Sequence, residues 1–310
     1  MRNFSLADIY SSIERIDNII PIERLSNRMR FGEHKSIFKS EGHDFDHIKE
    51  YEEGEDSIYD IIWSSIRPNK KPDVRKNIAT KEFIGMIMGD LSPSMMMGAD
   101  YQFKARLLLE VIGDVGMTCS HGNDPVGFIG FGQDVFFDES PRLGQEYVDY
   151  MIEEVYNFFE NLSSGDKKNP YRGATDFYKA FKFFSERYDD KECFLVVVSD
   201  FIGAEEIVDS QILKDIASRH EVVFIFLDDQ TEFEASSGIG FIRLENVETG
   251  QQSIVSRRGM KNIYRETREK RRQMRDTLNG MGIDCMVLEY GKQFQRLSRI
   301  FMARAEAFRM

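Results

Sequence analysis

Short, continuous apolar runs separated by stretches of helical periodicity constrain the fold of this chain most strongly. They begin near residue 83 and recur as far as residue 288. A strand that is apolar on both faces is typical of a parallel sheet covered by helices on both sides. The pattern therefore predicts an α/β fold with a doubly wound, mainly parallel sheet. The predicted strands are 83–88, 126–131, 135–137, 194–198, 222–227 and 286–288, and the predicted helices are 101–115, 146–162, 176–188, 205–218 and 294–308.

The first 81 residues do not follow this alternation. Residues 1–20 carry isoleucines at helical spacing and predict an amphipathic helix. The stripe is formed by Ile9, Ile13, Ile16 and Ile20. We therefore divide the chain into residues 1–81, with this helix and an extended segment, and residues 82–310, which form the α/β domain. Within that domain, residues 229–256 interrupt the alternation and predict a hairpin insertion.

Composition excludes several classes of function. The formal net charge is −12, and nucleic-acid binding needs an excess of basic residues, so we expect no nucleic-acid partner. The three cysteines are too few and too scattered for a disulfide framework or a zinc cluster. The sequence has no apolar run long enough to cross a membrane, and its N-terminal residues lack the apolar core of a signal peptide. We expect a cytoplasmic protein without a transmembrane segment.

Oxygen-bearing side chains follow two of the predicted strands at their carboxyl ends. Asp90, Ser92 and Ser94 alternate in the loop after the first strand. Asp200 follows a later strand, and Thr175 lies at a loop-to-helix junction. The carboxyl ends of parallel strands form a ligand-binding edge, and hard cations prefer oxygen ligands. The five residues therefore predict one site for Mg²⁺ or Mn²⁺, in which two carboxylates balance the charge and three hydroxyls are neutral.

Each of these five residues also has an ordinary structural explanation. Aspartate and serine side chains cap helices and accept hydrogen bonds from backbone N–H groups in turns. Capping accounts for any one of the five residues taken alone. The placement of the whole set at strand ends and at a helix start favours a binding site.

The five residues also carry a family resemblance. In this order and on this strand–helix rhythm, Asp90-x-Ser92-x-Ser94, Thr175 and Asp200 resemble the metal-ion-dependent adhesion site of von Willebrand factor A domains. The chain is also similar to the bacterial domain of unknown function fifty-eight. That pattern includes Trp63, Arg67, Lys104, Ser140-Pro141-Arg142-x-Gly144, Ser199-Asp200-Phe201 and Glu248-Thr249-Gly250. The resemblance implies a von Willebrand A-like domain over residues 82–310, preceded by a family-specific extended segment.

The resemblance also implies a function. Genes of this family commonly neighbour those of MoxR-type AAA+ ATPases. The expected role is a non-enzymatic, metal-dependent protein-interaction module that works with such an ATPase in the assembly or maturation of client proteins. In this interpretation the partner supplies an acidic side chain to an open position on the cation.

The alternative interpretation is a Mg²⁺-dependent phosphoryl-transfer hydrolase that uses Asp90. Enzymes of this kind usually have a second aspartate two residues after the nucleophile, where this chain has Ser92. We find no obvious phosphate-binding lysine beside it, no phosphate-binding loop of the P-loop type and no nucleophile elbow. We therefore expect no enzymatic activity.

A second feature concerns partner binding. The stretch from Arg257 to Arg275 contains nine basic residues against two acids, Glu266 and Glu269. Glu266 lies four residues before Lys270, which is the spacing of a local ion pair on a helix. The stretch is interpreted either as a solvated helix or as a docking surface for an acidic partner.

Overall fold

The computed structural model describes residues 5–14, 44–52, 61–68, 70–78, 84–96, 103–121, 123–163, 173–227, 241–245 and 252–288. The chain divides into two compact units. The larger unit contains Met1–Ile22 and Phe83–Ala303, and the smaller contains Glu23–Glu82 and Arg304–Met310. The predicted closing helix at 294–308 lies outside the described residues.

The larger unit is built around a six-stranded sheet with the strand order β10-β7-β6-β3-β4-β5. Neighbouring strands are parallel, except that β5 at one edge pairs antiparallel with β4. The sheet confirms the predicted mainly parallel α/β fold. The strands are β3 (Ile84–Asp90), β4 (Val126–Phe131), β5 (Val135–Arg142), β6 (Cys193–Ser199), β7 (Glu221–Leu227) and β10 (Asp284–Leu288).

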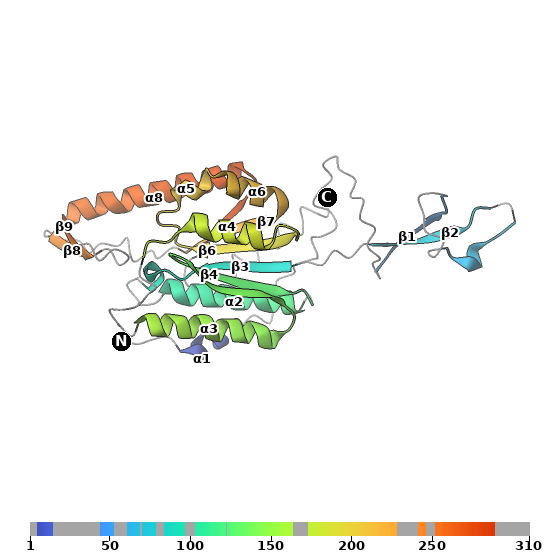
Figure 1. Ribbon diagram of the computed structural model, residues 1–310, viewed down its shortest axis with the longest axis horizontal. Coiled ribbons are helices and arrows are strands. Elements are labelled where there is room, and N and C mark those ends of the chain that lie inside the picture. The colour runs from blue at the N-terminus through green and yellow to red at the C-terminus, as the bar shows by residue number, and fades with distance from the viewer. Residues whose placement is uncertain are drawn as a thin grey trace. The chain divides into compact units, whose positions relative to one another are not determined.

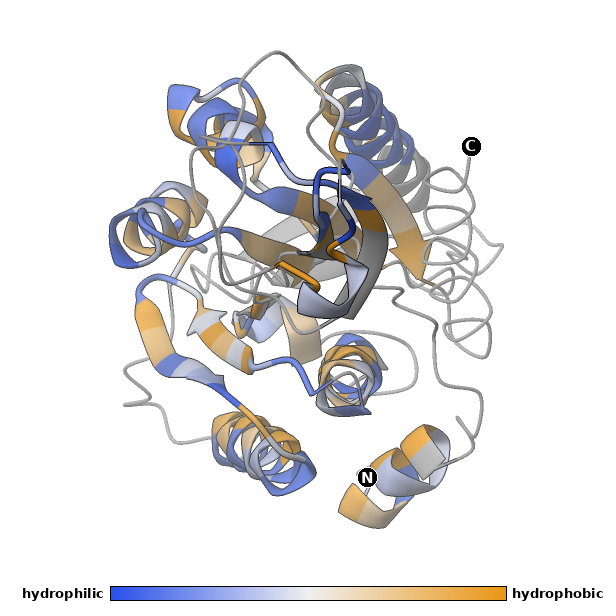
Figure 2. Ribbon diagram, turned by 90° about the vertical axis from the view of Figure 1, so that its right-hand side faces the viewer, coloured by the Kyte–Doolittle hydropathy of each residue, from blue (hydrophilic) through white to orange (hydrophobic). Residues whose placement is uncertain are grey.

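Helices cover both faces of this sheet, as a doubly wound fold requires (Figure 1). One face is covered by α1 (Leu6–Glu14), α2 (Phe103–His121) and α3 (Gln145–Ser163), and the other by α4 (Phe177–Arg187), α5 (Glu205–Val208), α6 (Gln211–Arg219) and α8 (Arg257–Gly280). Because successive side chains of a strand point to opposite faces, Ile87 and Val196 join the first core, whereas Met86 and Val197 join the second. Viewed along the strands, the helices carry hydrophilic residues on their outward sides (Figure 2).

The N-terminal helix α1 packs in the larger unit. Ile9 and Ile13 are buried in the core that α2 and α3 share, which confirms the first half of the predicted isoleucine stripe. The other two residues of the stripe, Ile16 and Ile20, lie outside the described residues. The sequence grouped α1 with residues 1–81, but its apolar contacts are with the α/β domain.

The described part of the smaller unit is an antiparallel pair of strands. β1 (Asp44–Glu50) pairs with β2 (Asp73–Ile78), and a short 3-10 helix, η3 (Trp63–Ser65), lies between them in the chain. Val74 of β2 is fully buried, whereas Trp63 is exposed. The pair agrees with the extended character predicted for this segment.

Three segments near the C-terminal end of the chain refine the prediction. The predicted helix at 205–218 is two helices, α5 and α6, because the Ser210 hydroxyl caps α6 by accepting a hydrogen bond from Leu213 N. β8 (Phe241–Glu245) and β9 (Gln252–Ser256) pair antiparallel and confirm the predicted hairpin. The basic stretch forms the N-terminal three quarters of α8. None of the described helices has both the length and the apolar character needed to cross a membrane.

Two glycines within α2 allow the neighbouring helices to approach closely. A Cβ atom on Gly116 would come within 2.6 Å of Val148 Cγ1 on α3. A Cβ atom on Gly113 would collide with Ile13 of α1. The close packing of α1 and α3 against α2 therefore depends on the absence of side chains at these two positions.

We predict that Gly116→Ala lowers the free energy of unfolding by about 1–3 kcal/mol, because the added methyl group overpacks the contact with α3. The matched control is Gly280→Ala at the end of α8, where a Cβ atom meets nothing within 4 Å. Alanine favours a helix, so this control should be neutral or stabilising. Urea unfolding followed by circular dichroism measures both variants, and equal midpoints for the two would contradict the packing argument.

Candidate functional site

The predicted site residues lie at the topological switch point of the sheet. From β3 the chain continues to β4 on one side, and it later returns to place β6 on the other side of β3. In open α/β sheets, ligands bind beyond the carboxyl ends of strands at such a point. Gly89 pairs with Val198, so the next residues, Asp90 of β3 and Ser199 of β6, lie side by side.

Asp90 is buried and both of its carboxylate oxygens accept hydrogen bonds. The backbone N–H of Ser92 donates to Oδ1 at 2.8 Å. The Ser199 hydroxyl donates to Oδ2 at 2.6 Å. The Ser92 side chain also forms a hydrogen bond with this carboxylate, so Asp90 is held both from the loop after β3 and from β6.

The two serines of the loop after β3 place their hydroxyl groups together. Ser92 Oγ lies 2.9 Å from Ser94 Oγ, and the loop continues into a 3-10 turn, η4 (Pro93–Met96). Two adjacent ligands of an octahedral Mg²⁺ at roughly 2.0–2.1 Å are themselves about 2.9 Å apart. Ser92 is buried and Ser94 is half-buried, so the hydroxyl pair connects the buried carboxylate to the surface. The spacing and chemistry of these donors fit a small hard cation.

Asp200 follows β6 and is held by a tight backbone turn. Phe201 has φ 53°, which is the left-handed region, and its N–H donates to Ser199 Oγ at 2.8 Å. The N–H of Ile202 donates to Asp200 Oδ1 at 3.1 Å. These bonds fix the Asp200 carboxylate at the edge of the sheet next to Asp90.

Lys104 of α2 forms an ion pair with Asp200 inside this cluster. Lys104 Nζ lies 2.9 Å from Asp200 Oδ2, and the two side chains are 1% and 2% exposed. Arg271 of α8 is also buried nearby, where it donates to the carbonyl oxygen of Leu227 at 2.8 Å. Two basic side chains therefore accompany the two carboxylates.

The two carboxyl groups differ in their pKa values. Burial, followed by the charge of Asp200, raises the pKa of Asp90 to about 7. Burial also acts to raise the pKa of Asp200, but the charge and hydrogen bond of Lys104 outweigh it and leave that pKa below its usual value. Lys104 thus makes Asp200 the carboxylate that is ionised first.

Thr175 is positioned by its loop rather than by contact with the other predicted ligands. The next residue, Asp176, donates its N–H to the carbonyl oxygen of Gly132, directly after β4, at 2.8 Å. Asp176 also caps α4 by accepting a hydrogen bond from Lys179 N at 2.9 Å. These bonds hold the half-buried Thr175 near the carboxyl end of the sheet, but among the described residues its hydroxyl makes no hydrogen bond to the other four.

Four of the five predicted residues form one connected cluster, whose polar neighbours the prediction did not include. Within the described ranges, no three or more His, Cys, Asp or Glu side chains gather in a way that would hold a metal ion. The cluster instead combines two carboxylates with hydroxyl groups. A cation here would rely on Asp90, Asp200, Ser92 and Ser94, with Thr175 supplied by the adjacent loop.

The sequence contained a signal for one residue that was not predicted as part of the cation site, Lys104. Lys104 lies on the apolar stripe of α2, at helical spacing from Leu108, Val111 and Val115, which are all buried. A lysine on a buried stripe requires a charged partner. The sequence shows no obvious phosphate-binding lysine beside Asp90, and the structure pairs Lys104 with Asp200.

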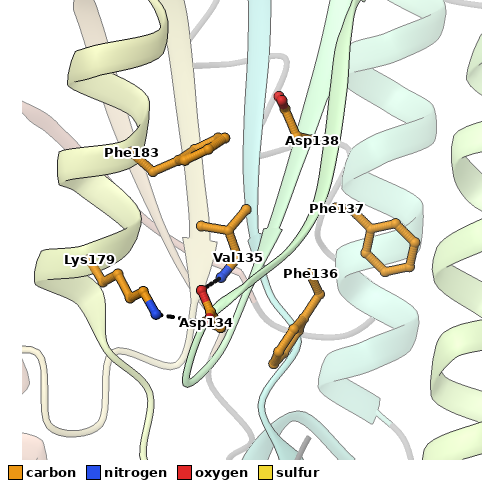
Figure 3. A pocket seen from close by; sticks show the side chains of 7 residues that line it. All are labelled: Asp134, Val135, Phe136, Phe137, Asp138, Lys179 and Phe183. Atoms are coloured by element: carbon orange, nitrogen blue, oxygen red, sulfur yellow. Dashed lines mark hydrogen bonds and ion pairs between the residues drawn. The ribbon is translucent and has the colours of Figure 1, made fainter.

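A hollow of about 320 Å³ lies between β5 and α4 (Figure 3). Lys179 and Phe183 line it from α4, and Val135 lines it from β5. Lys179 Nζ pairs with Asp134 in the β4–β5 turn at 2.8 Å. The hollow contains none of the predicted cation ligands, but its turn and helix start are the same segments that hold Thr175.

The fold and the site define an α/β protein with a carboxylate and hydroxyl cluster at the switch point of its sheet. The family model described as "Protein of unknown function DUF58" matches residues 47–276. The chain belongs to this family. No curated protein matches the chain.

Solved structures also match the chain, at low identity. A conserved hypothetical protein, BatB, from Bacteroides thetaiotaomicron is 15% identical, with a TM-score of 0.38 over 73% of this chain and 100% of that one. An uncharacterized membrane spanning protein from Vibrio fischeri is 12% identical, with a TM-score of 0.25 over 72% of this chain and 98% of that one. A variant of the PilB minor pilin from Streptococcus sanguinis is 9% identical, with a TM-score of 0.42 over 78% of this chain and 66% of that one.

The raised pKa of Asp90 predicts a pH-dependent stability when no divalent cation is bound. The carboxyl group keeps its proton up to about pH 7 in the folded protein, but only to about pH 4 in the unfolded chain. The stabilising contribution of Asp90 to the free energy of unfolding is therefore fully present below about pH 4, and it is lost as the pH rises through about 7. Asp90→Asn removes this titration, so the variant should gain stability relative to the wild type as the pH rises.

Urea unfolding in EDTA at pH values from about 4 to 8 tests this expectation. The control is Asp190→Asn, which makes the same change at an exposed position before β6, at the opposite end of the sheet. A difference between Asp90→Asn and the wild type that stays constant with pH would contradict a protonated Asp90.

Proposed function

We propose that this protein is a non-enzymatic interaction module that binds one divalent cation, Mg²⁺ or Mn²⁺, at its switch-point cluster. The ligands are Asp90, Ser92, Ser94, Thr175 and Asp200, in an arrangement that resembles the metal-ion-dependent adhesion site of von Willebrand factor A domains. The cation then forms the centre of a contact with another protein. Several coordination positions are left to water or to that partner.

The observation that carries this proposal is the pair of hydroxyl oxygens, Ser92 Oγ and Ser94 Oγ, 2.9 Å apart beside Asp90. This spacing suits two neighbouring ligands of one octahedral cation. The two hydroxyls form a hydrogen bond with each other at this distance, and among the residues that the structure describes neither of them caps an α-helix. The second carboxylate, that of Asp200, lies at the end of the adjacent strand, where it could bind the same cation.

The charge of the cluster favours an acidic group on the partner. When Asp90 is ionised, the two carboxylates are balanced by the Lys104 ammonium and the nearby Arg271 guanidinium, so a divalent cation gives the cluster an excess of positive charge. A carboxylate from a partner would reduce this excess at short range. The chain as a whole is acidic, with a net charge of −12, so the cation supplies a local attraction for an acidic group.

We propose that the partner is a MoxR-type AAA+ ATPase and that the pair acts in the assembly or maturation of client proteins. The resemblance of the chain to families encoded beside such ATPases supports this choice. Helix α8 offers a second contact, because Arg265 and Arg268 are exposed on a helix with a strong excess of basic residues. Its positive charge would steer an acidic partner before the short-range contact forms.

One observation favours the alternative, a Mg²⁺-dependent phosphoryl-transfer hydrolase that uses Asp90. Lys104 places an ammonium group in the cluster, as phosphoryl-transfer sites commonly do. However, that ammonium is already paired with Asp200 at 2.9 Å, and Ser92 stands where a second acid would transfer a proton. These contacts favour binding over catalysis.

We predict that the double variant Ser92→Ala/Ser94→Ala loses capture of the MoxR-type ATPase. Removing both hydroxyls together removes their mutual hydrogen bond without leaving one of the pair unpaired, and Asp90 keeps its bonds from Ser92 N and Ser199, so the fold should be retained. A pull-down with the tagged wild type, the double variant and the control Asp190→Asn, all in Mg²⁺, gives the comparison. A variant is the sharper test here because EDTA also removes the Mg²⁺ that the ATPase needs for nucleotide binding.

The wild type and the Asp190→Asn control should capture the ATPase, and the double variant should not. Equal capture by all three would contradict a role for the cation in the contact. A Mg²⁺-dependent turnover of phosphate esters that disappears in Asp90→Asn would replace the proposal with the hydrolase alternative.

A further inference from the structure

Lys104 is a fixed positive charge in the same cluster where a cation is proposed to bind. Its ammonium lies 2.9 Å from Asp200 Oδ2, and its side chain is 1% exposed. Lysine is almost never buried to this extent unless it is paired with an acid. The side chain extends from the apolar stripe of α2, so its position is set by the packing of that helix against the sheet.

We propose that Lys104 is an internal counter-cation of this site, which stabilises the cation-free protein and weakens the binding of divalent cations. This inference rests on the proposed function, because it concerns the affinity of the same cluster for a metal. It assigns to Lys104 a positioning and tuning role rather than that of a ligand.

In the protein without a divalent cation, Lys104 offsets the charge of a buried carboxylate. Asp90 and Asp200 are both 1% exposed and lie close enough for the charge of one to raise the pKa of the other. Two buried carboxylates without a counter-charge would destabilise the fold. Lys104 compensates Asp200, and the hydrogen bonds from Ser199 and Ser92 satisfy Asp90.

When a divalent cation binds, the Lys104 ammonium competes with it. A unit positive charge within the cluster repels the incoming cation and shares the Asp200 carboxylate with it. Removing the lysine charge should therefore tighten cation binding by a factor on the order of ten or more, since charges interact strongly through an effective dielectric constant of about 20. The same removal should destabilise the cation-free protein, because it leaves Asp200 buried without its partner.

The experiment compares Lys104→Met with the wild type and with the control Lys179→Met. Lys179 lies four residues after Thr175, and its side chain is 50% exposed, so the control removes an equal charge from a solvated position near the site. The dissociation constant of Mn²⁺ is measured from the free Mn²⁺ signal in electron paramagnetic resonance. The melting temperature is measured in EDTA and again in saturating Mn²⁺.

The expected result has two opposite changes in Lys104→Met alone. Its Mn²⁺ affinity should rise by about tenfold or more, while its melting temperature in EDTA falls. Addition of Mn²⁺ should therefore raise its melting temperature more than that of the wild type. Lys179→Met should match the wild type in both measurements.

Lys104→Met could be too unstable to fold in EDTA. Recovery of its native circular dichroism on addition of Mn²⁺ would then support the inference, because it shows that the cation replaces the missing charge. Lys104→Gln, which removes the charge but keeps hydrogen-bond donors, then supplies the dissociation constant. Failure of Mn²⁺ to restore the fold, together with an unchanged affinity in Lys104→Gln, would overturn the inference.

The outcomes separate this inference from the proposed function. Binding of Mn²⁺ to the wild type with an unchanged affinity in Lys104→Met would overturn the inference and leave the proposed cation site intact. Binding to Lys104→Met but not to the wild type would support the inference and overturn the proposed function, because Lys104 would then be the resident cation. Absence of binding in every variant would overturn both.

Discussion

The parallel pairing of β3 with β6 is the constraint on which the site depends. These two strands are neighbours in the sheet although about a hundred residues separate them in the chain, as the hydrogen bond from Ser199 to Asp90 shows. Gly89 contributes to this position, because a Cβ atom there would come within 2.8 Å of the Phe128 ring. The last residue of β3 is thereby held at the level of the β6 end, so Asp90 and Asp200 meet where the strand order reverses.

The close approach of the Asp90 and Asp200 carboxylates is electrostatically unfavourable, and the surrounding residues partly compensate for it. Buried carboxylates side by side disfavour ionisation, which is why Asp90 has a raised pKa. Lys104 stabilises the charge of Asp200, and the field of Arg271 acts in the same direction. A cluster of this kind adds little to the stability of a fold, since well-packed apolar residues would serve as well. Buried charged groups in place of apolar residues are typical of functional positions, so their presence here supports a binding role for the proposed site.

Much of the fold was predictable because its information is local. Continuous apolar strands such as 126–131 and 222–227 are typical of a covered parallel sheet, and they appear as β4 and β7. The break between α5 and α6 was missed because a single residue, Ser210, decides it by capping the second helix. Such side-chain to backbone bonds are weak signals within an otherwise helical pattern.

The candidate site was predictable in its residues but not in its electrostatics. The positions of Asp90 and Asp200 at strand ends followed from the alternation of strands and helices, and the close approach of Ser92 to Ser94 followed from their spacing. The pairing of Lys104 with Asp200 joins residues 96 positions apart, so no local pattern contains it. The pKa difference between the two aspartates depends on that pair and on burial, and it therefore emerges only from the tertiary structure.

Anomalous diffraction from crystals soaked in Mn²⁺ would show whether a divalent cation binds at the strand-end cluster. We expect one strong peak at roughly 2.0–2.2 Å from oxygens of Asp90, Ser92 and Ser94. The same peak should be absent from crystals of Asp90→Asn. A peak in the wild type that appears only at other positions would contradict a cation site at this cluster. The absence of any peak there at saturating Mn²⁺, with the hydrogen bonds of the cluster intact, would contradict it as well.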